Sequence, residues 1–384
     1  MYENAEKIIN LPVGIITALG TVMIPHISKI DMNEKNEIKK RLNESFELVF
    51  FLIFPIIFGI LGISKDFSNI YFGNGFSKSA DIMNMLTLTI IFTGIANVIR
   101  TNYLNTQTIS SSQLFNLGDS LRDIFRTTGV SGRSQSDVST GGSNWEALVC
   151  WYLNLCTINR PVFIIKHNRE LLPTPVSNAI TVNYGSFKSN TESDLIAISV
   201  PNLDDYTQDK NLIDISTQEG NKVPTHIRNK YQYLPIMNTL IARDFDKIGI
   251  HIIQCKTNWN DNAQIPMLWD AIYAAINFTN NISVGSEGYT PRDCKEFSYS
   301  FVTVPSNSLE KNGNPTYKTT STSVLRVRNL SGGNYWGLPD EQGVASSVKT
   351  LVERRLRGDL AQSIHSTLNQ AIPLLDSTYS YFNL

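Results

Sequence analysis

The sequence predicts two parts of different fold class: a transmembrane α-helical segment of about three helices, followed by an α/β domain with a mixed central sheet. Long apolar runs fill much of residues 1 to about 105, whereas the remainder is polar and rich in Asn, Ser and Thr. In that remainder, short β-branched runs alternate with helical patterns, an order typical of layered α/β domains. We therefore expect a membrane segment at 1–106, a linker and irregular part at 107–144, and a folded domain at 145–384.

Three apolar runs carry the membrane prediction. They lie at residues 8–24, 48–63 and 82–99. A helix needs roughly 17–25 mostly apolar residues to cross the hydrocarbon core of a bilayer, and each run is near that length. Buried helices of a soluble protein have a similar composition, but three such runs in so short a segment favour a membrane. We expect residues 8–99 to bind the membrane.

The basic residues between these runs predict the orientation of the segment. Cytoplasmic loops of membrane proteins carry an excess of Lys and Arg. The first loop holds Lys29, Lys35, Lys39, Lys40 and Arg41, whereas the second holds only Lys65 and Lys78. The first loop is therefore predicted to be cytoplasmic. Three crossings then place everything after Arg100 in the cytoplasm, anchored to the inner membrane.

A family resemblance covers the same segment. Residues 6–25 (EKIINLPVGIITALGTVMIP), 72–76 (FGNGF) and 97–104 (NVIRTNYL) resemble the middle of a polysaccharide flippase of the Wzx type, in the MOP/MATE superfamily. Such flippases are much larger helical bundles, so the resemblance implies a truncated fragment. A gene fusion, a recombination scar or a sequence-assembly join would each produce it.

Charge and cysteine content limit the function of the remainder. The chain has 33 basic and 34 acidic residues, a formal net charge of -1, so any DNA-binding surface must be a local patch. The four cysteines show neither CxxC spacing nor a histidine at zinc-ligand spacing. Reduced thiols in a cytoplasmic domain are the simplest interpretation.

The α/β domain is predicted to begin with a helix at Trp145, after a Ser/Gly-rich loop at 133–144 that ends in a Ser143-Asn144 cap. The patterns predict strands at 162–166, 179–184, 194–200, 249–256, 297–304 and 323–327, and helices at 234–242, 265–278 and 344–356. Residues 331–337 are glycine-rich and predict a structured loop.

Two of these predicted strands end in side chains that suit phosphodiester chemistry. Gln254 and Lys256 share one face of their strand because alternate residues point the same way, whereas Cys255 points to the other face and into the core. Asp194 begins another buried strand. Cleavage of a phosphodiester needs an aligned water, a cation on the phosphate and stabilisation of developing charge. An acid and a lysine from adjoining strands are typical of metal-dependent nucleases.

Three motifs together resemble the PD-(D/E)xK nuclease superfamily, which includes many type II restriction endonucleases. They lie at residues 142–146 (GSNWE), 192–196 (ESDLI) and 253–256 (IQCK). The resemblance implies a restriction-endonuclease-like fold and a Mg²⁺-dependent endodeoxyribonuclease of restriction or defence type. Its partner would be double-stranded DNA. Many such enzymes form homodimers to cut both strands, although this sequence carries no sign of one.

The resemblance also assigns roles to individual residues. Asp194, Gln254, Glu146 and the main-chain carbonyl of Cys255 would bind Mg²⁺, and Lys256 would orient or deprotonate the attacking water. Gln254 departs from the common pattern, in which Asp or Glu stands there. Some members of the superfamily use Gln, so the departure leaves open whether the site is active.

Candidate DNA contacts follow the catalytic strand and appear again later in the chain. They are Asn258, Asn260, Gln264, Arg326 and Arg328. Asn and Gln pair well with adenine, and Arg pairs with guanine or phosphate.

Each site residue also has a purely structural interpretation. Asp194 would cap a turn, Lys256 would be a solvated strand end, and Glu146 would be favoured by the dipole at a helix start. The alternative functions are a flippase-family membrane protein with a non-catalytic soluble tail, and a DNA-binding module that has lost catalysis. The recognition sequence and cut position cannot be read from the sequence.

Overall fold

The computed structural model describes residues 8–9, 35–73, 79–84, 86–87, 109–126, 135–168, 170–189, 193–217, 219–228, 230–257, 282–303, 310–311, 314–315, 322–337, 346–382 and 384. The chain divides into two compact units. The first comprises residues 1–114, 126–133 and 371–384, and the second comprises residues 115–125 and 134–370.

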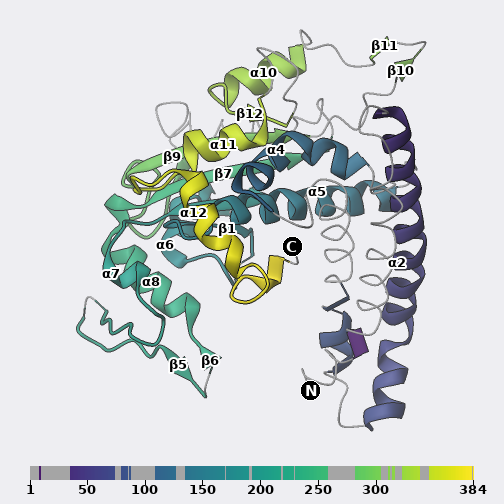
Figure 1. The fold of residues 1–384 in the computed structure, drawn as a ribbon. Coiled ribbons are helices and arrows are strands. Elements are labelled where there is room, and N and C mark those ends of the chain that lie inside the picture. Colours follow the sequence, from purple (N-terminus) through teal and green to yellow (C-terminus); the bar gives the residue numbers. More distant parts are fainter. Residues whose placement is uncertain are drawn as a thin grey trace. The chain divides into compact units, whose positions relative to one another are not determined.

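Among its described residues, the first unit contains one long helix, α2, at Lys35–Phe72 (Figure 1). Within the described part of the chain, α2 is the helix that is long and apolar enough to cross a membrane, over Ile53–Tyr71. One side packs Ile53 and Ile57 against Ile9. Phe58 is 68% exposed, as expected of a side chain that would face lipid. One candidate membrane helix is therefore established near the N-terminus, whereas the predicted runs 8–24 and 82–99 fall mostly outside the described residues.

Helix α2 is longer than the apolar run 48–63 that predicted it. Its 38 residues correspond to about 57 Å, whereas a bilayer core is about 30 Å thick. Basic residues expected in two loops lie on the helix instead, namely Lys35, Lys39, Lys40, Arg41 and Lys65. A helix continues beyond the apolar run because Lys, Arg and Glu are themselves good helix formers. The cytoplasmic orientation remains a prediction.

The second unit is built on a mixed sheet, as predicted. In the described residues it has the order β1-β4-β7-β9-β12 (Figure 1). The strands are β1 (Val162–Lys166), β4 (Leu195–Ser199), β7 (Gly249–Lys256), β9 (Glu296–Thr303) and β12 (Tyr335–Trp336). β1, β4 and β7 pair antiparallel, whereas β9 pairs parallel to β7 and β12 pairs parallel to β9. The predicted strands at 162–166, 194–200, 249–256 and 297–304 thus lie side by side.

Helices and short ribbons complete the described chain. The helices are α4 (Ser111–Arg126), α5 (Gln135–Cys156), α6 (Thr174–Ala179), α7 (Asp204–Thr207), α8 (Tyr233–Arg243), α10 (Thr322–Leu330), α11 (Val348–Arg355) and α12 (Ile364–Ala371), with 3-10 turns at Phe245–Lys247, Ile372–Leu374 and Ser380–Phe382. The ribbons are β3-β2-β8 (Phe187–Ser189, Val182–Tyr184, Ile282–Val284), β5-β6 (His226–Ile227, Lys230–Tyr231) and β10-β11 (Glu310–Lys311, Asn314–Pro315).

The main core covers one face of the sheet. Alternate residues of the central strands, Ile196 and Ile198 on β4 and Ile250 and Ile252 on β7, pack in one cluster with side chains of α6 and α8. Helix α5 contacts β1 and β7 but contributes nothing to that cluster. Its Trp145 is fully buried and donates its indole N–H to a main-chain oxygen of β9 at 3.4 Å. The sheet thus lies between α5 and the α6–α8 layer.

The region 107–144, predicted to be a linker and irregular, is largely helical. Helix α4 occupies Ser111–Arg126, and α5 begins at Gln135 rather than at Trp145. The Ser/Gly content misled the prediction, because each glycine costs only about 1 kcal/mol in a helix interior. A helix whose later turns are buried can extend through such residues.

Two shorter predictions were also wrong. The expected strand 323–327 is part of α10, in which Val324 is fully buried. A five-residue run with β-branched residues does not distinguish a strand from a short helix. The expected loop 331–337 contains β12, because its glycines at positive φ flank Tyr335 and Trp336 rather than interrupt them.

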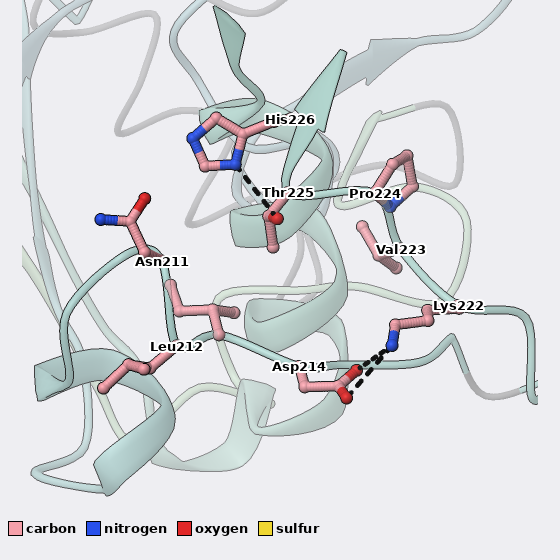
Figure 2. A pocket seen from close by; sticks show the side chains of 9 residues that line it. Asn211, Leu212, Asp214, Lys222, Val223, Pro224, Thr225 and His226 are labelled. Carbon is pink, nitrogen blue, oxygen red and sulfur yellow. Dashed lines mark hydrogen bonds and ion pairs between the residues drawn. The ribbon is translucent and has the colours of Figure 1, made fainter. Parts of the chain in front are cut away.

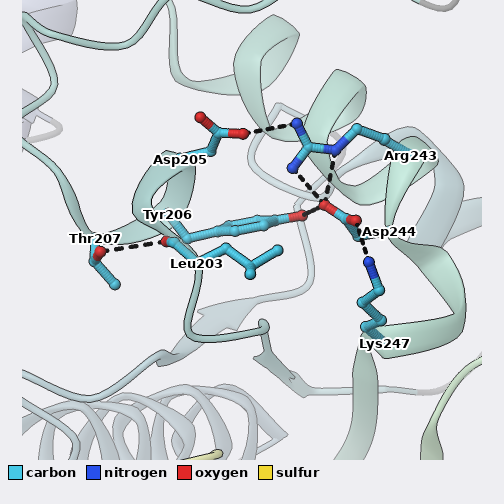
Figure 3. Close-up of polar contacts among 7 residues, drawn as sticks. All are labelled: Leu203, Asp205, Tyr206, Thr207, Arg243, Asp244 and Lys247. Carbon is cyan, nitrogen blue, oxygen red and sulfur yellow. Dashed lines mark hydrogen bonds and ion pairs between the residues drawn. The ribbon is translucent and has the colours of Figure 1, made fainter.

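A buried carboxylate joins α7 to the end of α8 (Figure 3). Asp244, 3% exposed, accepts hydrogen bonds from Arg243 Nε at 2.9 Å, Lys247 Nζ at 2.9 Å and the Tyr206 hydroxyl at 3.3 Å. Arg243 also pairs with Asp205 at 2.7 Å. Burial alone would raise the pKa of Asp244, but these hydrogen bonds hold it below its ordinary value.

Candidate active site at the end of strand β7

The side chain of Asp194 closes the end of the β4–β7 ladder. Leu195 pairs with Ile253, and beyond this pair the Asp194 Oδ2 atom accepts the main-chain N–H of Cys255 at 2.7 Å. A regular ladder would offer Cys255 a main-chain carbonyl at this position. The carboxylate replaces that carbonyl, so Asp194 caps the end of the β4–β7 ladder.

Asp194, Gln254 and Lys256 lie on one face of the sheet. Asp194 continues the alternation of Ile196 and Ile198 on β4, and Gln254 continues that of Ile250 and Ile252 on β7. Continuing the antiparallel register by one residue places Asp194 opposite Gln254. The register therefore places the positions of the acid and the lysine on the same face of the sheet.

Cys255 contributes its main chain to this edge and its thiol to the core. In an antiparallel ladder a residue directs both N–H and C=O to the same neighbour, so the Cys255 carbonyl also faces the Asp194 side. The thiol is buried, and burial raises its pKa well above the ordinary value. The charges of Asp194 and Glu146 raise it further, whereas Lys256 lowers it. The charges of Asp194, Glu146 and Lys256 thus all act on the C-terminal end of β7.

Gln254 is almost completely buried, at 1% exposure. Its Oε1 atom accepts a short hydrogen bond from the hydroxyl of Tyr299. Tyr299, on β9, pairs with Ile252 in the parallel ladder and is itself 2% exposed. The amide is therefore held in one position from the β9 side.

Glu146 occupies a different setting from the one predicted. It lies within α5, more than two turns after Gln135, so the dipole at a helix start does not favour it. Its Oε2 atom is 2.7 Å from Lys166 Nζ, and Lys166 also donates to Ser143 Oγ at 3.2 Å. Lys166 is on the even-numbered face of β1, which α5 covers. Glu146 is thus close enough to affect the Cys255 thiol but is neutralised by a second lysine.

Sequence reasoning missed three neighbours of the site: Lys166, His167 and Tyr299. The main-chain N–H of His167 donates to the Asp194 carbonyl at 3.1 Å, and its Nδ1 atom lies 2.7 Å from Ser193 Oγ. Lys166 is the last residue of a predicted strand and His167 directly follows it, which was a usable signal. Nothing in the sequence marked Tyr299, because it alternates regularly within its strand.

The atoms available at this strand end are of the type that binds Mg²⁺. The Asp194 carboxylate, the Cys255 carbonyl and the Gln254 amide oxygen are all oxygen donors, which Mg²⁺ prefers. In the described part of the chain, no group of three or more His, Cys, Asp or Glu side chains is placed to hold a metal ion. A site here would therefore depend on one strand carboxylate, main-chain oxygen and an amide.

The predicted DNA contacts are only partly placed. Asn258, Asn260 and Gln264 lie outside the described residues, and so does the predicted helix 265–278. Arg326 and Arg328 are on α10, with Arg328 in its last turn. The side chain of Arg326 is likewise outside what the structure describes. The DNA-binding surface stays a prediction.

A separate pocket lies between α7 and β5 (Figure 2). Its volume is about 730 Å³, and it is lined by Asn211, Leu212, Ile213, Asp214, Lys222, Val223, Pro224, Thr225 and His226. An exposed ion pair of 3.1 Å joins Asp214 to Lys222 in its wall. None of the predicted site residues lines this pocket, so it is distinct from the Asp194–Lys256 site.

Comparison with known proteins bears on the first unit. Residues 1–105 match the family model of the lipid II flippase MurJ. This match confirms the prediction of a flippase-like segment, although it spans only 105 of 384 residues. No curated protein and no solved structure matches the chain. The second unit is therefore interpreted from its geometry alone.

Proposed function

We propose that the second unit is a Mg²⁺-dependent DNA endonuclease of restriction or defence type, preceded by a membrane-anchored, flippase-like segment. The observation that carries the proposal is the placement of Asp194 and Lys256. They lie on the same face of adjoining antiparallel strands, at the edge where the Cys255 main chain turns toward Asp194. The mixed strand order supports it, because helix, three antiparallel strands and a parallel fourth agree with the nuclease resemblance.

The roles follow from the chemistry of each group. Asp194, the Cys255 carbonyl and Gln254 would hold the cation, which when bound polarises the phosphate and activates water. Lys256, half-buried at the end of β7, would orient the attacking water and offset phosphate charge. Glu146, paired with Lys166 on the α5 face of the sheet, would act through its charge rather than as a ligand of the cation. The domain would act in the cytoplasm on double-stranded DNA, alone or as a homodimer.

A second candidate function is favoured by the MurJ match. In that alternative, the chain is a membrane protein of the flippase family, and its soluble tail is non-catalytic. Residues 1–105 would then serve in moving lipid II, the molecule that the name of the matched family gives. The replacement of an acid by Gln254 is compatible with such an inactive tail.

A plasmid-cutting assay separates the two functions. Full-length protein in detergent is incubated with supercoiled DNA and Mg²⁺, with EDTA as the control. The nuclease proposal expects nicked or linear DNA only with the metal. Absence of cutting with Mg²⁺ and with Mn²⁺, by protein that retains its folded circular-dichroism spectrum, would favour the non-catalytic tail.

A further inference from the structure

Position 254 carries Gln where the nuclease superfamily usually has Asp or Glu. The contact between Gln254 and Tyr299 bears on how this amide would bind a cation. Both Gln254 and Tyr299 are at least 98% buried, and they come from strands that pair in parallel. Tyr299 lies opposite Ile252, on the face that carries Ile252 and Gln254. Its hydroxyl therefore reaches two residues along β7, to the next side chain on the same face, and donates to Gln254 Oε1.

This hydrogen bond decides which end of the amide faces β9. Tyr299 donates, so the carbonyl oxygen is the end that it holds. An amide oxygen has two lone pairs, so a bond from one hydroxyl is compatible with cation binding by the same atom. A long polar side chain loses conformational freedom when it binds, and a side chain that is already ordered loses less.

We propose that Tyr299 is a positioning residue for divalent-cation binding at the Asp194–Gln254 edge. By holding Gln254 Oε1 in one position from the β9 side, its hydroxyl lets a neutral amide serve where a carboxylate is usual. This inference rests on the proposed nuclease function. Tyr299 itself does not touch the cation or the substrate; it acts through Gln254.

The test measures cation binding without DNA. Full-length protein in detergent is titrated with Mn²⁺, a spectroscopic probe that accepts the same oxygen ligands as Mg²⁺, and free Mn²⁺ is followed by electron paramagnetic resonance. Tyr299→Phe is expected to raise the Kd for Mn²⁺ about three- to tenfold, the effect of one lost hydrogen bond. Tyr335→Phe is the matched control, because it removes a buried tyrosine hydroxyl from the same core cluster. It should leave Kd within about twofold.

A second readout is the Mg²⁺ dependence of plasmid cutting. Tyr299→Phe should raise the Mg²⁺ concentration that gives half the maximal rate, while the rate at saturating Mg²⁺ stays near wild type. Gln254→Glu should bind Mn²⁺ more tightly than wild type, because a carboxylate is the stronger ligand. If Tyr299→Phe does not fold, the Mn²⁺ titration of Gln254→Glu shows whether the side chain at position 254 binds the cation.

Three results would overturn the inference. Tyr299→Phe could bind Mn²⁺ as wild type does, Tyr335→Phe could weaken binding as much, or Gln254→Glu could leave binding unchanged. In these cases wild-type cutting stands, and only the role of Tyr299 is lost. If wild-type protein neither binds Mn²⁺ nor cuts DNA, the proposed function itself fails, and this inference fails with it.

Discussion

The carboxylate of Asp194 accepts the main-chain N–H of Cys255 at 2.7 Å, across the end of two antiparallel strands. This contact gives one side chain two roles, because the group that ends the ladder is also the best candidate to bind a cation beside Lys256. Substitutions at Asp194 must therefore separate the loss of charge from the loss of the strand contact.

Asp194→Asn makes this separation. The amide oxygen of Asn can still accept the Cys255 N–H, whereas the negative charge is lost. We expect plasmid cutting with Mg²⁺ to fall by about 100-fold or more, with a melting temperature close to that of wild type. Asp194→Ala should lose activity and, in addition, about 1 kcal/mol of stability. If Asp194→Asn cut DNA at the wild-type rate, Asp194 would not be a ligand of the cation. Asp214→Asn is the control, because it changes an exposed carboxylate in the separate pocket.

Lys256→Ala tests the other half of the site. A lysine that orients water or stabilises phosphate charge typically contributes about 100-fold or more to the rate. Lys256 is half-buried at the end of β7, so its removal should change stability little. The rate of plasmid nicking and the circular-dichroism melt are measured together. Lys222→Ala, which removes an exposed lysine in the wall of the separate pocket, is the matched control, and an equal loss of rate in both variants would contradict the assignment.

Asp244 predicts a pH dependence of stability. Its pKa in the folded protein is below that in the unfolded chain, so its contribution is fully present above about pH 4 and is lost as the pH falls through the folded pKa. Asp244→Asn should destabilise the protein by roughly 1–3 kcal/mol at pH 7, since Arg243 and Lys247 lose a charged acceptor. The difference in melting temperature between variant and wild type should shrink at acid pH. A constant difference down to pH 2 would argue against this origin.

The four cysteines are free thiols, as the sequence predicted, and two of them, Cys156 and Cys255, are buried. Burial raises the pKa of Cys150 to about 11, of Cys156 to about 12 and of Cys294 to about 11, and that of Cys255 well above its ordinary value. At pH 8 we expect alkylation about 100-fold slower than for an exposed thiol. Mass spectrometry after iodoacetamide treatment measures this, with denatured protein as the control. Rapid labelling of Cys255 in folded protein would contradict its placement.

Helix α2 predicts a membrane-integrated chain. Phe58 is exposed in the middle of the candidate span, so Phe58→Lys should cost about 2.5–3.5 kcal/mol of insertion free energy and release part of the chain during carbonate extraction. Glu47→Lys is the control, because Glu47 lies outside Ile53–Tyr71. Equal extraction of wild type and both variants would indicate that α2 does not span a bilayer.

The sequence predicted the central strands well because their signals are local. The run 249–256 is strongly apolar and β-branched, and β7 has these bounds in the structure. Alternation along it also placed Gln254 and Lys256 on one face. The extension of α5 back to Gln135 was not predictable, because it depends on packing that outweighs poor helix formers.

The sequence could not predict which side chains contact one another between elements that are distant along the chain. Tyr299 is 45 residues from Gln254, and Lys166 is 20 residues from Glu146 along the chain. Both contacts depend on which strands become neighbours, and no local pattern encodes that choice. The predicted cluster therefore had the right strand residues but lacked the groups that hold Gln254 and Glu146.

The parallel pairing of β7 with β9 has a consequence for biogenesis. These two strands meet only after the intervening chain has closed a long loop, and such non-local pairing forms late and slowly. A ribosome that has just released residue 256 has therefore not yet made Tyr299, and the amide of Gln254 has no hydroxyl to order it. On the proposed function, the nascent polypeptide would lack an ordered site until β9 has been synthesised and docked.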